Sequence, residues 1–158
     1  MDVVRLAKLT DYAIVILSAF ARAPGQLQTA PALARTTGLP LATVAKVLKM
    51  LGRGGIVDST RGSGGGYHLA RVASRIGVAA ILEVMEGPIA LTACCTDGGD
   101  RCGIEPGCPV KDHWRRISET VLGALSELTL EDLIQPLPTQ RRRPERSPML
   151  LNAASLRR

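Results

Sequence analysis

The segment from Leu39 to Leu69 constrains the fold most, because its hydrophobic pattern changes abruptly from helical to extended. Apolar residues first recur at i, i+3, i+4 and i+7, which predicts a helix over residues 42–51 with one buried face. These residues are Val44, Val47, Leu48 and Leu51. Glycines from Gly52 onward end the helix. Ile56 and Val57 then begin a strand, and the glycine-rich stretch 62–66 turns the chain into a return strand at Tyr67.

Two further helices are predicted upstream of this segment. The first ends at about Arg22, with Thr10 as its N-cap, and the second covers residues 30–36 with Thr29 as its N-cap. Gly38 and Pro40 form the turn into the helix at 42–51. This order is typical of a helix-turn-helix followed by a β-hairpin wing, in which the helix enters the DNA major groove and the hairpin flanks it. We therefore predict a mainly α fold with a small β-hairpin wing.

The charge distribution agrees with a polyanionic partner for the first half of the chain. Residues 1–80 hold ten Lys/Arg and three Asp/Glu, whereas residues 81–135 hold four and ten. Residues 136–158 hold six and one. A basic first half suits nucleic acid, so we expect double-stranded DNA as a partner.

The predicted DNA-binding domain covers residues 1–87, and its last helix covers residues 74–86. Three further segments are predicted after this domain. Residues 88–108 form a cysteine-rich loop, residues 109–135 a long helix that begins with Pro109 at N1 and one further turn, and residues 136–158 a basic disordered tail. The long helix carries an apolar seam at heptad spacing, which favours a homodimer over packing within one domain. The seam comprises Val110, Trp114, Ile117, Val121, Ala124 and Leu128.

The loop contains four cysteines and no C-x-x-C pair, which argues against a zinc ribbon or a thioredoxin-like site. Thiolates suit iron–sulfur clusters or zinc, and spacing alone leaves a metal site and a set of free thiols equally open. The apolar run at 13–21 is too short to span a membrane, so we expect a cytoplasmic protein with no membrane partner. Because no nucleophile motif or phosphate-binding loop is present, we expect no enzymatic activity.

Residues 5–135 resemble winged-helix transcriptional regulators of the IscR and NsrR type, and most closely those of the SUF iron–sulfur assembly system. The matching pieces, in order, are KLTDYAIVIL, LPLATVAKVLKML, RGSGGGYHLA, EGPIALTAC, CGIEPGCPV and TLEDL. The resemblance implies a homodimeric DNA-binding regulator that is controlled by an iron–sulfur cluster. We expect a repressor of iron–sulfur assembly genes.

The resemblance also implies the cluster ligands. Cys94, Cys102 and Cys108 match the three cysteine ligands, and Cys95 could replace Cys94. IscR-like proteins have a His where this chain has Lys111, so the fourth ligand is open between His113 and an Asp11 donated by the other subunit. A 2Fe–2S cluster is expected rather than a 4Fe–4S cluster.

The expected DNA-binding residues lie on the helix at 42–51 and on the wing. Thr43, Lys46 and Lys49 are taken as the exposed polar side chains of the helix, and Ala45 replaces a Glu of the IscR-like pattern. The wing contributes Arg61, Ser63, Gly64 and Tyr67, with Arg61 directed to the minor groove by resemblance. Two alternatives stay open: a thiol- or zinc-based redox sensor on the same scaffold, and an iron–sulfur carrier protein.

Overall fold

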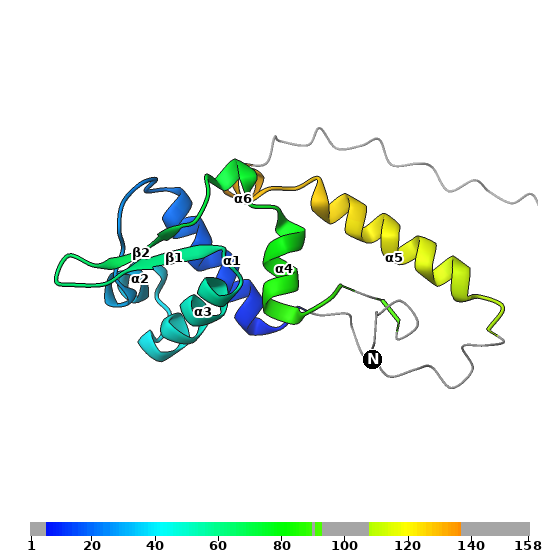
Figure 1. The fold of residues 1–158 in the computed structure, drawn as a ribbon, viewed down its shortest axis with the longest axis horizontal. Helices are drawn as coiled ribbons and strands as arrows, with labels where there is room; N and C mark the ends of the chain where they lie inside the picture. The colour runs from blue at the N-terminus through cyan, green and yellow to red at the C-terminus, as the bar shows by residue number, and fades with distance from the viewer. Residues whose placement is uncertain (1–5, 90, 93–107, 137–158) are drawn as a thin grey trace, which may run out of the picture.

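The computed structural model describes residues 6–89, 91–92 and 108–136, which fold into a small helical domain with an extended helix leading away from it (Figure 1). The elements are α1 (Lys8–Ala21), α2 (Ala30–Thr37), α3 (Leu41–Arg53), β1 (Val57–Thr60), β2 (Gly66–Leu69), a 3₁₀ turn η1 (Ala73–Arg75), α4 (Val78–Glu86), α5 (Lys111–Ser126) and α6 (Leu130–Ile134). The mainly α winged helix-turn-helix predicted from the sequence is confirmed.

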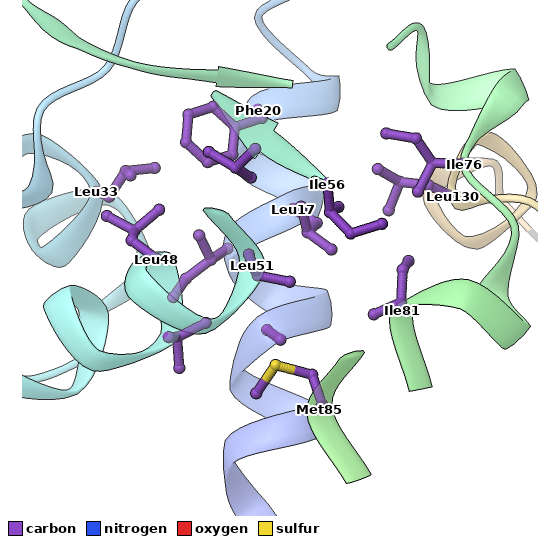
Figure 2. Packing of buried hydrophobic residues seen from close by; sticks show 14 of the residues in the cluster. Leu17, Phe20, Leu33, Leu48, Leu51, Ile56, Ile76, Ile81, Met85 and Leu130 are labelled. Carbon is purple, nitrogen blue, oxygen red and sulfur yellow. The ribbon is translucent and has the colours of Figure 1, made fainter. Parts of the chain in front are cut away.

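The hydrophobic core is built around α1, whose residues Ile16, Leu17 and Phe20 are buried. Helices α3 and α4 pack against α1 from different sides, and α2 adds its buried residue Leu33 to the same core (Figure 2). Among the described residues, Phe20 is the one aromatic side chain in the buried cluster, and the others are aliphatic except Met85, in keeping with the low aromatic content of 3%. This packing fixes the orientation of α3 relative to the rest of the domain.

The wing is a two-stranded antiparallel hairpin in which Val57 pairs with Leu69 and Thr60 with Gly66. Gly62 has φ +112°, a conformation that L side chains rarely adopt. A Cβ at Gly65 would lie 2.2 Å from the Thr60 carbonyl oxygen, so the tight turn excludes any side chain there. The backbone of this turn therefore requires glycine at positions 62 and 65, as the glycine-rich sequence predicts.

Helix α6 returns from the end of α5 and completes the core of the N-terminal domain. Leu130 is fully buried beside Ile76 (Figure 2). The Leu130 amide donates to the Ile76 carbonyl at 2.8 Å, and the Val78 amide donates to the Leu128 carbonyl at 2.9 Å. Thr129 caps α6 through its hydroxyl, and hydrogen bonds from that hydroxyl and from the Thr129 amide lower the pKa of the Asp132 carboxyl.

Three predicted helix boundaries are wrong, and each error has a local cause. The N-cap of α1 is Ala7, because the Thr10 hydroxyl is buried and donates to Glu86 instead. The helix predicted over 74–86 is interrupted, because Ile76 is extended and pairs with Leu130. Pro109 precedes α5 in a turn closed by the Lys111 amide on the Cys108 carbonyl, so it is not at N1.

Helix α5 leads away from the domain, at the side opposite the wing (Figure 1). All six seam residues predicted from the heptad spacing are exposed, and among the described residues α5 contacts mainly α4. Among the described residues, no helix is both long enough and apolar enough to cross a membrane.

The contribution of α6 to the core can be measured with a pair of variants in one helix. Leu130→Ala should lower the free energy of unfolding by about 2–5 kcal/mol, because it removes a fully buried side chain. Leu133→Ala, at an exposed position of the same helix, should change it by less than about 0.5 kcal/mol. Urea denaturation monitored by circular dichroism compares the two. Equal effects would mean that α6 does not belong to the folded core.

Candidate nucleic-acid interface and cysteine segment

Helix α3 forms because its apolar residues fall on one face, which packs against α1, α2 and α4. The opposite face is exposed and comprises Leu41, Ala42, Ala45, Lys46, Lys49 and Arg53. Lys46 and Lys49 lie on the exposed face as predicted. Thr43 does not, because it is half-buried at the edge of the packed face. Leu41 and Ala42 are exposed at the start of α3 and are not among the predicted contacts, because apolar residue types carry no sequence signal of exposure.

The wing presents Arg61, Ser63 and Gly64 as exposed residues at its turn, and Tyr67 is half-buried at its base. The amides and carbonyls of Tyr67 and Gln28 exchange two hydrogen bonds of 2.9 Å. These bonds join the hairpin to the loop that precedes α2, so the wing has a fixed position relative to the helix-turn-helix. The position of Tyr67 suits this structural role.

A shallow hollow of about 400 Å³ lies between the start of α2 and the wing. Thr29 and Ala30 line one side, and Thr60, Arg61 and Gly62 line the other. Arg61 is exposed there, and no ion pair involves it among the described residues. Arg61 therefore adds an exposed positive charge on the wing to those of Lys46, Lys49 and Arg53 on α3, and such charges suit DNA phosphates.

Of the predicted cluster ligands, the structure describes Cys108, Asp11 and His113. Cys108 carries a free, half-buried thiol three residues before the start of α5, whereas Asp11 and His113 are exposed on α1 and α5. Cys94, Cys95 and Cys102 lie outside the described residues. Within the part of the chain that the structure describes, no three metal-binding side chains come together. The predicted ligand set therefore remains a prediction.

Glu86 connects α1 to the start of the cysteine segment, which is the cysteine-rich loop predicted at residues 88–108. It is the last residue of α4, and its carboxylate accepts hydrogen bonds from the Ala7 amide, at 2.7 Å, and from the Thr10 hydroxyl. This contact is not predictable from the sequence, because residues 76 and 79 positions apart carry no local signal of pairing. The first turn of α1, which contains Asp11, is thereby held at the point where the chain leaves α4.

The fold, the basic exposed face of α3 and the glycine-rich wing define a winged-helix DNA-binding protein. The sequence profile of the Rrf2 family, described as iron-dependent transcriptional regulators, matches residues 6–136. The chain belongs to this family and is a DNA-binding transcriptional regulator, not an enzyme.

Individual relatives and solved structures agree with this assignment. The HTH-type transcriptional regulator NsrR of Oceanobacillus iheyensis is 30% identical over 82% of this chain and 89% of its own length. IscR of Serratia proteamaculans is 33% identical over 61% of this chain and 58% of its own. The structure of CymR, the global cysteine regulator of B. subtilis, aligns with a TM-score of 0.64 and 26% identity, over 84% of this chain and 97% of that one.

The proposed DNA surface can be tested through the salt dependence of binding. Replacing Lys46 or Arg61 with Ala should weaken operator binding and lower the slope of log K against log salt by about one unit per lost phosphate contact. Arg116→Ala, at an exposed position on α5, provides the charge-matched control and should leave the slope unchanged. Fluorescence anisotropy at several salt concentrations gives the slopes. If both variants bind with wild-type slopes, DNA contacts another surface.

Proposed function

We propose that this chain is a homodimeric regulator that represses iron–sulfur assembly genes in the cytoplasm and responds to a bound iron–sulfur cluster. The observation that carries the proposal is the position of the cysteine segment. It is bounded by α4, which packs in the core of the DNA-binding domain, and by α5, which bears the exposed apolar seam. A ligand on this segment is therefore connected to both the DNA-binding and the dimerisation elements.

The chemistry of the donors fits an iron–sulfur cluster. Cys108 is a free thiol at the end of the segment, and three more cysteines precede it. Thiolates are the usual protein ligands of such clusters. Cys94, Cys102 and Cys108 would hold the cluster, with Asp11 or His113 as the fourth ligand. When bound, the cluster would supply a group whose presence depends on iron and on redox conditions.

The protein's own residues provide a route from this segment to the recognition helix. Glu86 fixes the end of α4 to the first turn of α1, and α1 packs directly against α3. A change in the backbone after Glu86 would alter this attachment and, through α1, the position of α3. A ligand that binds one of two such arrangements more tightly shifts the population toward it.

The apolar seam of α5 supports the proposed homodimer. Five of its residues are large hydrophobic side chains with exposures between 36% and 47%. They are Val110, Trp114, Ile117, Val121 and Leu128. Trp114, Ile117 and Val121 lie on α5 itself, and Val110 and Leu128 flank its two ends. An exposed apolar stripe at heptad spacing is typical of a helix that packs against a partner helix. A second copy of α5 is the partner that we propose.

The cluster ligands can be tested by serine substitution in anaerobically purified protein. Cys102→Ser and Cys108→Ser should each abolish the visible absorbance of the cluster, and Cys94→Ser should do the same. Cys95→Ser should spare the absorbance, because adjacent side chains tend to point apart and only one of residues 94 and 95 is expected to reach the cluster. Iron and sulfide assays on the same samples quantify the loss.

The fourth ligand is tested separately with Asp11→Ala and His113→Ala, of which only one should alter the spectrum. If the variant lacking all four cysteines retains iron and sulfide at wild-type levels, the cluster proposal is wrong.

The proposed dimer can be tested with two variants, each of which introduces one carboxylate on α5 at neighbouring positions. Val121→Asp would bury an unpaired charge in the seam at a cost of several kcal/mol and should produce a monomer. Thr120→Asp adds the same charge at an exposed position beside the seam and should leave the oligomeric state unchanged. Light scattering coupled to gel filtration measures the mass of each variant. A dimeric Val121→Asp protein would place the interface on another surface.

The free, half-buried thiol of Cys108 favours one alternative, a regulator that senses through cysteine thiols without a cluster. The two functions differ in acid-labile sulfide, which a cluster contains and a thiol or zinc site does not. Freshly purified anaerobic protein with no sulfide and no iron, but with oxidant-dependent DNA binding, would establish the alternative.

A further inference from the structure

The exposed face of α3 is divided into an apolar half and a cationic half. The N-terminal half presents Leu41, Ala42 and Ala45, and Leu41 is 50% exposed. The cationic half begins at Lys46, directly after Ala45, and continues through Lys49 and Arg53. In helix-turn-helix proteins, the N-terminal residues of the recognition helix contact the base edges. The apolar half of α3 is therefore the part that would face the bases.

This half lacks the side chains that read bases by hydrogen bonding. Helix α3 contains no Asn, Gln, Asp, Glu or His, and its one hydroxyl belongs to Thr43, which is half-buried. Bidentate recognition of adenine by an amide is thus excluded within α3, as is acceptance of a hydrogen bond from cytosine by a carboxylate. The chemical group in the major groove that an alkyl side chain can recognise is the C5-methyl group of thymine.

We propose that Leu41, Ala42 and Ala45 determine operator specificity by packing against thymine methyl groups in the major groove. This inference rests on the proposed function, in which α3 binds DNA, and names the chemical group on the bases that α3 recognises. The small side chains of Ala42 and Ala45 allow the helix backbone to approach the base edges closely. Lys46, which follows directly on the same face, would contact phosphate or an adjacent base and would hold the apolar residues in register.

The experiment uses the full-length protein and a DNA site obtained by in vitro selection from random duplexes. Each thymine of the selected half-site is replaced in turn by uracil, which deletes one methyl group and preserves base pairing. Loss of one contacted methyl should weaken binding about fourfold. Uracil at flanking positions outside the half-site provides the matched control and should have no effect.

Protein variants then assign the contact to α3. In Leu41→Ala or Ala45→Ser, the penalty for uracil at the contacted position should shrink toward onefold, because the variant no longer gains from the methyl group. Leu27→Ala removes a similarly exposed leucine outside α3 and should keep the full penalty.

The outcomes separate this inference from the proposed function. If selection yields a specific site and no uracil substitution within it weakens binding, the protein is a DNA-binding regulator and the methyl readout is wrong. If the penalty persists unchanged in both α3 variants, another element contacts the methyl groups and the assignment to α3 is wrong. If selection yields no preferred sequence, the proposed function and the inference both fail.

Discussion

The packing of α1 through the centre of the domain is the interaction on which the remaining structure depends. Ile16, Leu17 and Phe20 bury one side of the helix completely or nearly so, and α2, α3, α4, α6 and β2 all contact it. Dense packing of this kind transmits displacement instead of absorbing it. A shift of α1 would therefore move α3 and the base of the wing together, which is the property that a ligand-controlled DNA-binding protein requires.

The second constraint is the way in which the chain returns to its own core. After the cysteine segment and α5, Leu130 fills a site beside Ile76, and the two backbones are hydrogen bonded. Both ends of the segment formed by residues 87–129 are thus anchored in the DNA-binding domain, through Glu86 on one side and Leu130 on the other. This arrangement supports the proposed function, in which the cysteine segment and α5 regulate α3.

The sequence predicted the helices, the wing and the exposure of Lys46 and Lys49 on α3, because these features depend on local periodicity and on glycine. It failed where distant residues compete with local preferences. Thr10 has a good capping side chain, yet it bonds to Glu86, and Ile76 lies within a helical pattern, yet it pairs with Leu130. The burial of Thr43 likewise depends on tertiary packing, whereas the cluster ligands remain predictions from family resemblance and thiol chemistry.

The most direct test of cluster-controlled DNA binding is the operator affinity of one protein preparation before and after anaerobic removal of its iron. Both forms are measured by anisotropy at the same salt concentration and with the same selected duplex. Cluster control of DNA binding predicts that the two dissociation constants differ by at least about fivefold, the lower end of typical allosteric coupling. Equal constants for the two forms, at verified iron contents, would contradict it.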